Sequence, residues 1–244
     1  MLPRVPTSRD FPSAVQATII SPPQSHPATN ILVLLHGLGD TNDAFTALGR
    51  QMNLPETLCI SLRAPTPLPF DLGGFHWGDD LIFDQSTGEM EVDTGFISST
   101  ELLARNLVHD VLMEKCGYRL RDIILFGYGQ GAILALGTAV ELRKNEFGGV
   151  IAIGGILPHT SPPSLTPKCK TPVMICKGMR NSAVTPAEKE RLKSSFEFVD
   201  IKEWKKNADG MPSSRDEMLP IMQFLSRRLR SIREVPQGSI ELGL

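Results

Sequence analysis

The stretch "DIILFGYGQGAILALG", residues 122–137, decides the fold. After the leading aspartate it begins with a short apolar run, which predicts a buried strand. A helical pattern follows from Gln130, and Gly127, Gly129 and Gly131 stand at the junction. A strand that turns directly into a helix is the repeating unit of α/β domains.

Apolar runs alternate with helical patterns along the rest of the chain. Near-continuous hydrophobicity is typical of parallel strands that are covered on both faces. The predicted buried strands are residues 31–35, 57–62, 122–126, 149–155 and 172–178, with an edge strand at 14–21 and a last strand at 196–204. The predicted helices are residues 41–51, 97–115, 130–144, 186–195 and 214–230. This alternation predicts one α/β domain with a mostly parallel, doubly wound sheet flanked by helices.

The bulk properties limit the domain organisation and the partners. The chain has 244 residues, of which 41% are hydrophobic, and this is enough for a single domain with a full core. We expect this domain at residues 13–233, between a flexible N-terminal segment, 1–12, and a flexible tail, 234–244. Residues 64–94 lack a regular period and predict a long, functional loop. The net charge of −2, with both signs mixed, gives no reason to expect a nucleic-acid partner.

The cysteines and the hydropathy pattern indicate where in the cell the protein is expected. Cys59, Cys116, Cys169 and Cys176 form no C-x-x-C pair, which favours buried, reduced thiols over disulfides or a zinc site. No apolar run approaches the ~20 residues of a membrane span, and no signal peptide is recognisable. We therefore expect a cytoplasmic protein without a membrane span or a bound metal.

The glycine run allows two interpretations. Residues 127–132 fit G-x-G-x-x-A, a phosphate-binding turn, and also G-x-S-x-G, a nucleophile elbow, with Gly129 at the serine position. A dinucleotide site needs an acidic residue at the end of the following strand. That strand ends "AIGGILPH", residues 152–159, without one. The sequence therefore favours the elbow and predicts no cofactor.

A second stretch supports the elbow. "LVLLHGLGD", residues 32–40, reads as a strand that enters a His-Gly-Leu-Gly turn. A turn of this kind supplies one backbone N–H of an oxyanion hole, and the residue after the elbow supplies the other. Leu38 and Gln130 are therefore the predicted oxyanion and ligand-binding residues.

These two stretches occur with "RAPTPLP" (63–69), "HWGDD" (76–80), "GGILP" (154–158) and "GMPSSRDEM" (210–218). Together they resemble the acyl-protein thioesterases of the phospholipase/carboxylesterase family, in the family's order over residues 31–229. The resemblance implies an α/β-hydrolase fold and hydrolysis of carboxylic esters or thioesters. It also implies an acyl groove that Phe70, Phe75 and Trp77 could line, unless these aromatics only plug the edge of the sheet. His159 could face the same pocket.

The resemblance fails at the catalytic positions. Family members carry serine in G-F-S-Q-G, aspartate in H-G-x-x-D-x-x-V and histidine in G-M-x-H-S-S. The corresponding positions here are Gly129, Asn181 and Pro212, and Lys177 replaces the histidine of the acid stretch. Glycine has no nucleophilic oxygen, proline cannot transfer a proton, and asparagine cannot stabilise an imidazolium as a carboxylate does. The sequence therefore leaves open whether the protein is an enzyme.

Three functions fit this pattern. The favoured one is a degraded hydrolase that binds an acyl chain, an acylated peptide or a partner protein without turning it over. The first alternative is an active ester or thioester hydrolase with relocated groups, His159 or His76 being the candidates. His76 could bind a metal or form a dyad with Asp79 and Asp80, although a solvated loop rim is the simpler interpretation of these three residues. The second alternative is an interaction scaffold with a closed pocket.

Overall fold

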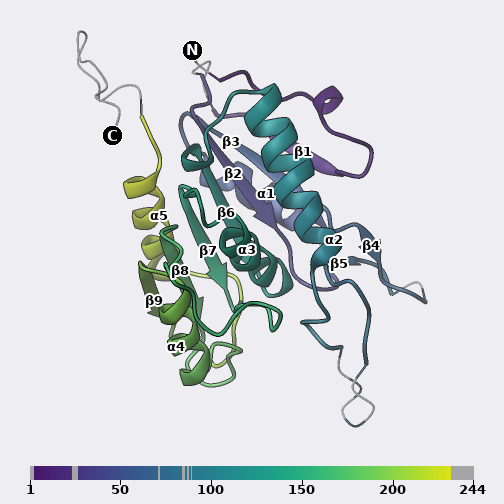
Figure 1. Ribbon diagram of the computed structural model, residues 1–244, viewed down its shortest axis with the longest axis vertical. Helices are drawn as coiled ribbons and strands as arrows, with labels where there is room; N and C mark the ends of the chain where they lie inside the picture. Colours follow the sequence, from purple (N-terminus) through teal and green to yellow (C-terminus); the bar gives the residue numbers. More distant parts are fainter. Residues whose placement is uncertain are drawn as a thin grey trace.

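The computed structural model describes residues 3–23, 27–70, 72–83, 86, 88 and 90–231. Within them, seven strands form one sheet in the order β1-β3-β2-β6-β7-β8-β9 (Figure 1). The strands are β1 (Ala17–Ile20), β2 (Asn30–Leu35), β3 (Thr57–Leu62), β6 (Ile123–Tyr128), β7 (Gly149–Ile153), β8 (Val173–Lys177) and β9 (Val199–Glu203). Only β1 runs antiparallel to its neighbour in this sheet. The predicted doubly wound sheet is confirmed, including its edge strand.

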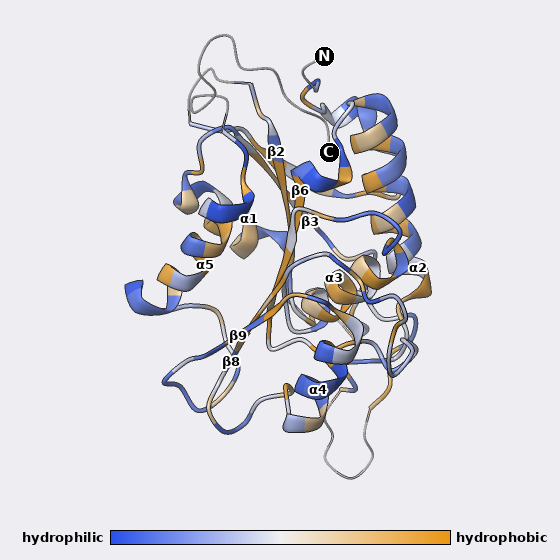
Figure 2. Cartoon of the chain, turned by 60° about the vertical axis from the view of Figure 1, so that its left-hand side comes forward, coloured by the Kyte–Doolittle hydropathy of each residue, from blue (hydrophilic) through white to orange (hydrophobic). Residues whose placement is uncertain are grey.

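Helices cover both faces of the sheet (Figure 2). On one face lie α1 (Asn42–Met52) and α5 (Arg215–Arg228). On the other lie α2 (Ile97–Thr100), its continuation η2 (Glu101–Lys115), α3 (Gln130–Glu141) and α4 (Pro186–Ser195). Alternate residues of β2 enter the two cores: Ile31 and Val33 pack on the η2 and α3 side, Leu32 and Leu34 on the α1 and α5 side. This is why a strand covered on both faces is apolar throughout.

The predicted helices are present, and their starts follow the capping residues. The Thr41 hydroxyl accepts the Asp43 N–H at 3.2 Å, and the Ser214 hydroxyl accepts the Glu217 N–H at 3.3 Å. The helix predicted over 97–115 forms with a difference in type, since η2 is a π-helix. The spacing of apolar residues predicts a helix but does not fix its hydrogen-bond register.

The loop predicted over residues 64–94 contains a small hairpin. Strand β4 (Thr66–Pro67) pairs with β5 (Phe75–His76). Two-residue strands are too short to show a period, so the sequence pattern missed them. At the other end of the chain, the N-terminal segment contains η1 (Ser8–Asp10), and Arg4 N–H donates to the Cys116 carbonyl at 2.8 Å. The tail predicted over 234–244 lies outside the described residues.

Candidate active site

The turn between β6 and α3 has the geometry of a nucleophile elbow. Gly129 adopts φ 52° and ψ −118°, a backbone conformation that residues with a Cβ rarely accept. Its N–H donates to the Ile153 carbonyl at 2.9 Å, and its carbonyl accepts the Ala132 N–H at 3.0 Å. The sharp turn places residue 129 at the carboxyl edge of the sheet, where its backbone is partly accessible to solvent.

The flanking glycines are required by close packing. A Cβ at Gly127 would lie 2.3 Å from the Gly131 carbonyl oxygen, and one at Gly131 would lie 2.4 Å from the Leu35 carbonyl oxygen. Gly129 is different, because a Cβ there would meet only the Gly37 Cα, at 4.0 Å. The space for a nucleophilic side chain is therefore open, while the side chain itself is absent.

The two predicted oxyanion residues belong to adjoining turns. The turn that contains Leu38 is held by a hydrogen bond from the Gly39 N–H to the Phe75 carbonyl, at 2.9 Å. The buried Gln130 side chain accepts the Trp77 N–H at 2.7 Å and donates to the Val92 carbonyl at 3.2 Å. Within the described chain, neither the Leu38 N–H nor the Gln130 N–H donates to a protein acceptor. Their role as oxyanion donors stays a prediction.

His36 is part of the framework beside this turn. Its Nδ1 lies 2.8 Å from the Gly37 carbonyl oxygen, and its Nε2 accepts the Ala64 N–H at 3.0 Å. The Trp77 ring lies against it, 5.2 Å away between ring centres, and Trp77 Nε1 donates to the His36 carbonyl. Burial lowers the pKa of His36, although the Gly37 carbonyl and Asp40 oppose the shift. Both ring nitrogens are thus engaged in holding the turn.

The loops that correspond to the family's acid and base are joined to each other. Asn181 is exposed, and its N–H donates to the Asn207 carbonyl at 2.8 Å. The carboxylate of Asp209, which no sequence motif indicates, accepts the Gly178 N–H at 2.8 Å and the Ala183 N–H at 2.9 Å. Asp209 also packs over Gly154, where a Cβ would lie 2.7 Å from its own. A carboxylate therefore lies at the end of β7, the strand next to β6, but it already accepts hydrogen bonds from two backbone N–H groups.

The base loop is anchored from its other side as well. Lys206 Nζ donates to the Met211 carbonyl at 2.8 Å and pairs with the Glu217 carboxylate at 3.0 Å. Glu217 also accepts the Ser213 N–H at 2.8 Å. Pro212 lies between these two anchors and is partly buried. Lys177, the substituted residue at the end of β8, is buried and contacts Glu203 at 3.2 Å. These side chains hold backbone in place.

His76 and His159, the two histidines proposed as relocated catalytic groups, occupy contrasting sites. His76 is 4% exposed, so its interpretation as part of a solvated rim is wrong. Burial lowers the pKa of His76, against the opposing effects of the Gly78 backbone and Asp80. Among the described residues, its Nδ1 has no hydrogen-bond partner. Asp79 is committed elsewhere, since it accepts the Ile97 N–H at 2.7 Å and starts α2. Asp80 is exposed and accepts the Leu81 N–H at 2.8 Å.

His159 has a carboxylate partner that the sequence did not indicate. The Asp93 side chain is 3% exposed and lies 3.5 Å from His159 Nδ1, and it accepts the His159 backbone N–H at 2.7 Å. The imidazole itself is 64% exposed. Sequence spacing gave no signal for this pair, because 66 residues separate its members.

The candidate groove residues do not share one surface. Phe70 is 87% exposed beyond β4, whereas Trp77 is fully buried against His36 and is not available to a ligand. Phe75 is partly buried and lies under the Arg63 guanidinium, 4.5 Å from carbon to ring centre. A groove at Phe70 and Phe75 stays a prediction.

The described side chains do not favour a cysteine nucleophile or a metal site. Burial raises the pKa of Cys59 and of Cys176 to about 12 and also raises the pKa of Cys116 and Cys169. A thiol in this state is a poor nucleophile. In the described part of the chain, no three His, Cys, Asp or Glu side chains are grouped as metal ligands would be. No helix there is both long and apolar enough to cross a membrane.

The parallel sheet, the elbow before α3 and the adjoining oxyanion turn define an α/β-hydrolase. A family model described as Phospholipase/Carboxylesterase matches residues 15–229, and the chain belongs to that family. An uncharacterized hydrolase of Schizosaccharomyces pombe is 32% identical over 206 residues, which cover 82% of this chain and 83% of the relative.

Acyl-protein thioesterase 1 of Saccharomyces cerevisiae is 30% identical over 138 residues, 53% of this chain and 59% of the yeast protein. The solved structure of esterase PE8 has a TM-score of 0.68 at 24% identity and covers 88% of this chain and 99% of its own. That likeness shows the fold alone. The predicted fold and family are both confirmed, and the family is of carboxylesterase and acyl-protein thioesterase type.

Proposed function

We propose that the protein is a catalytically degraded hydrolase that binds an acyl chain, an acylated peptide or a partner protein without turning it over. The observation that carries this proposal is the elbow itself. Gly129 keeps the conformation and the open space of a nucleophile position but brings no oxygen. The Leu38 and Gln130 N–H groups beside it can still donate hydrogen bonds to a carbonyl oxygen.

The two loops support the same conclusion. Asn181 and Pro212 stand where the acid and base are expected, and neither can perform that chemistry. Asp209 contributes a carboxylate nearby, but its oxygens accept backbone N–H groups of the acid loop. A site with donors and no triad retains only about 10³–10⁴-fold acceleration over water. We place the protein in the cytoplasm, which four buried, unpaired thiols support.

Turnover and labelling test the proposal directly. The purified chain should hydrolyse p-nitrophenyl butyrate and a palmitoyl thioester at trace rates only, and a fluorophosphonate probe should leave it unlabelled. Calorimetry with a non-hydrolysable acyl ligand should detect binding that weakens when Gly129→Val fills the elbow. Labelling of a defined serine, or turnover comparable to that of an intact esterase, would contradict the proposal.

Restoring the triad is a gain-of-function test. The triple variant Gly129→Ser, Asn181→Asp and Pro212→His should become reactive toward the fluorophosphonate, because the space at residue 129 is open. The matched control carries Gly129→Ala with the same two other changes and should stay unlabelled. A triple variant that folds and remains inert, while the wild type binds no acyl ligand, would favour the scaffold function.

A second candidate function rests on Asp93 and His159. A buried carboxylate beside an exposed imidazole is the arrangement that orients a general base. Such a pair could activate water in a hydrolase with relocated groups. His159→Gln and Asp93→Asn should then reduce any measured turnover by at least about 100-fold, whereas the pseudoenzyme leaves the trace rate unchanged in both variants.

A further inference from the structure

The segment between β5 and α2 projects beyond the carboxyl edge of the sheet (Figure 1). Two limbs of this segment, residues 79–83 and 90–97, run antiparallel and are joined by a bridge near their far end. We call the two limbs the projecting loop. Beside the elbow, the Gln130 side chain donates to the Val92 carbonyl at 3.2 Å. The projecting loop is therefore continuous with the candidate active site.

The projecting loop exposes large apolar side chains. Ile82, Phe83 and Val92 are 45%, 42% and 44% exposed, and Ile97, where the loop meets α2, is 78% exposed. Four of the ten exposed large apolar side chains of the described chain thus lie in this one segment. Single exposed apolar residues are ordinary, whereas a concentration of them marks an interaction surface. Across the limbs, the Glu91 N–H donates to the Ile82 carbonyl at 2.8 Å, so an acidic residue adjoins the apolar ones.

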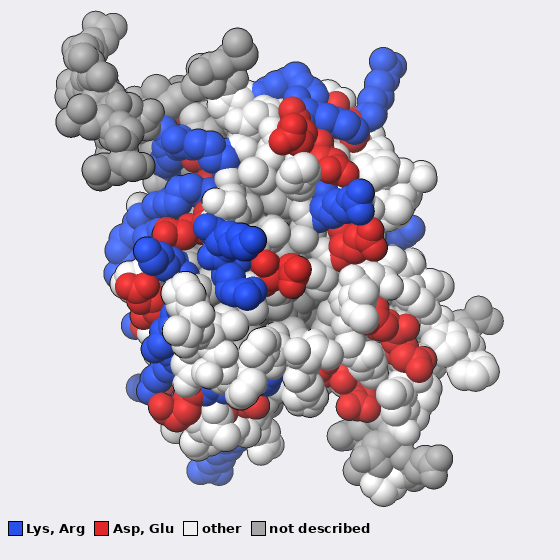
Figure 3. Space-filling model, viewed as in Figure 1, with Lys and Arg blue, Asp and Glu red and all other residues white. Residues whose placement is uncertain are grey.

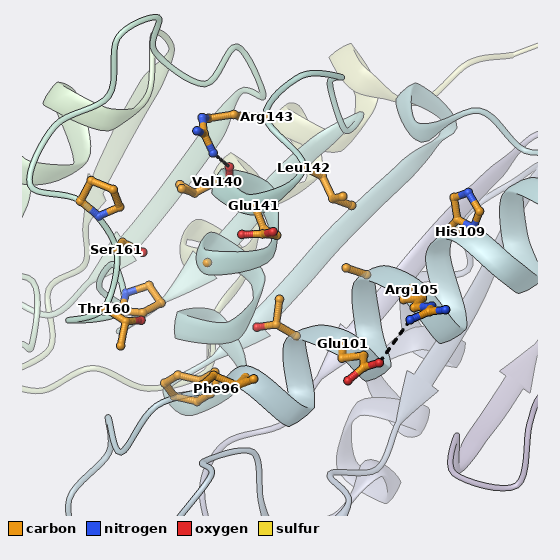
Figure 4. A pocket seen from close by; sticks show the side chains of 16 residues that line it. Phe96, Glu101, Arg105, His109, Val140, Glu141, Leu142, Arg143, Thr160 and Ser161 are labelled. Atoms are coloured by element: carbon orange, nitrogen blue, oxygen red, sulfur yellow. Dashed lines mark hydrogen bonds and ion pairs between the residues drawn. The ribbon is translucent and has the colours of Figure 1, made fainter.

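The charge of this region has one sign. No lysine or arginine occurs between Arg63 and Arg105, whereas eight acidic residues do, at positions 71, 79, 80, 84, 89, 91, 93 and 101. The last of them, Glu101, is paired with Arg105 at 3.6 Å, so the acidic surface ends there (Figure 4). The lower right of the face in Figure 3, where the projecting loop lies, shows acidic side chains and no basic ones.

Two carboxylates of the projecting loop are left to attract a partner. Asp79 accepts two backbone N–H groups at the start of α2, and the buried Asp93 faces His159. Asp80 and Glu91 are exposed, and neither pairs with a lysine, arginine or histidine among the described residues. An apolar surface that carries uncompensated negative charge favours a partner that is both apolar and basic.

We propose that the projecting loop docks a basic, apolar segment of a partner protein, and that this segment adjoins the acylated residue held at the elbow. Apolar side chains of the partner cover Ile82, Phe83 and Val92. Its lysine or arginine side chains pair with Asp80 and Glu91. A membrane surface fits less well, because anionic lipids repel an acidic loop. The acylated residue rests on the proposed function, whereas docking of the peptide can be measured without an acyl group.

Three seven-residue peptides test the charge preference in the full chain. All carry leucine at the same three positions, and the other four positions are lysine, glutamine or glutamate. By calorimetry at about 20 mM salt, the lysine peptide should bind about tenfold more tightly than the glutamine peptide, because each of two exposed ion pairs contributes a factor of roughly two to five. The glutamate peptide should bind most weakly. At about 500 mM salt, where screening is strong, the preference for lysine should fall to about twofold.

A double variant locates the charge. Asp80→Asn with Glu91→Gln should remove the preference for lysine and leave binding of the glutamine peptide unchanged. The matched control, Glu146→Gln with Glu197→Gln, removes two exposed carboxylates that precede β7 and β9, at the opposite edge of the sheet, and should change nothing.

The apolar contact and the acyl site are tested separately. Phe83→Ala should weaken the lysine and glutamine peptides by about threefold, whereas Phe198→Ala, which removes a ring 54% exposed elsewhere, should weaken neither. A lysine peptide with an octanoyl amide at its centre should bind more tightly than the unacylated one. If the octanoyl group adds nothing while the preference for lysine persists, the proposed acyl site is contradicted and the docking surface is supported.

The proposal is overturned if the lysine and glutamine peptides bind equally at low salt, if neither binds at millimolar concentration, or if the preference survives in Asp80→Asn with Glu91→Gln. Sedimentation with vesicles tests the membrane alternative. The chain should stay in solution with vesicles of phosphatidylcholine and phosphatidylserine. Sedimentation with the vesicles that is lost in Phe83→Ala would assign the projecting loop to a lipid surface and overturn the proposal.

Discussion

The elbow and the loops that carry the acid and base positions lie at the same edge of the sheet, yet they are held in different ways. On either side of the elbow residue, Gly127 and Gly131 allow backbone to approach backbone, and no side chain fits at these two positions. In the loops, Asp209 and Glu217 hold backbone through side-chain hydrogen bonds. Close packing ties the elbow to the stability of the fold, whether or not catalysis is needed. The loops can change their chemistry as long as their anchors remain.

The largest effect is expected where packing is closest. Gly131→Ala should lower the free energy of unfolding by about 3 kcal/mol or prevent folding, because its Cβ would lie 2.4 Å from the Leu35 carbonyl oxygen. Urea denaturation measures the change. Gly210→Ala, in the base loop, is the control, since nothing lies within 4 Å of its Cβ. Equal stability of the two variants would show that the elbow is not held by close packing.

A smaller loss of stability is expected when the contact between the acid loop and the base loop is removed. Asp209→Ala removes a carboxylate that accepts two backbone N–H groups, and it should cost about 2 kcal/mol of stability. Asp200→Ala, which removes a surface carboxylate paired with Lys202, should cost well under about 1 kcal/mol. Chemical denaturation of both variants makes the comparison. A neutral Asp209→Ala variant would mean that the loops hold without this anchor.

The sequence predicted the sheet and its helices because these elements depend on local patterns. The apolar run in β2 is continuous since both of its faces are buried, and Thr41 marks the start of α1 by its own hydrogen bond. The sequence did not predict the β4–β5 hairpin, because a strand of two residues is too short to show an alternation of apolar and polar residues. The surface in Figure 3, where acidic and basic side chains are interspersed over most of the face shown, agrees with the mixed charge along the chain.

The site was predictable only as far as it depends on the backbone. The glycine spacing located the elbow, and the HGLGD turn located Leu38. Asp209 and Asp93 could not be found, because each acts on backbone that is distant in sequence. The sequence left open whether Trp77 lines a groove or plugs the edge of the sheet, and its contacts with His36 make it part of the core. Spacing along the chain does not reveal which face of a loop an aromatic ring will occupy.

A moderate effect is expected at the elbow itself. Gly129→Ser should fold and lose about 1 kcal/mol, since the positive φ is strained for a residue with a Cβ while the space is open. Gly129→Ala is the control for strain without a hydroxyl and should lose the same amount. The serine variant alone should not react with a fluorophosphonate, because Pro212 stands where the family's base is expected and cannot take the serine proton. Rapid labelling would reveal a base near residue 129 and would reverse the interpretation of the acid and base loops.

The smallest effect is a pH dependence of the base loop. Burial alone would raise the pKa of Glu217, but the Ser213 N–H, the Lys206 ammonium and the Ser213 hydroxyl outweigh it and hold the pKa below its usual 4.5. A carboxyl with a depressed pKa stabilises the fold fully above its unfolded value, and this contribution disappears as the pH falls through the folded value. Between about pH 5 and pH 3 the wild type should therefore lose stability that Glu217→Gln has already lost, by up to about 1 kcal/mol. Urea denaturation at several pH values across that window measures the free energy of unfolding of each protein. The control Glu197→Gln removes an exposed carboxylate elsewhere and should follow the wild type. If the wild type and Glu217→Gln showed the same pH dependence, Glu217 would not anchor the loop.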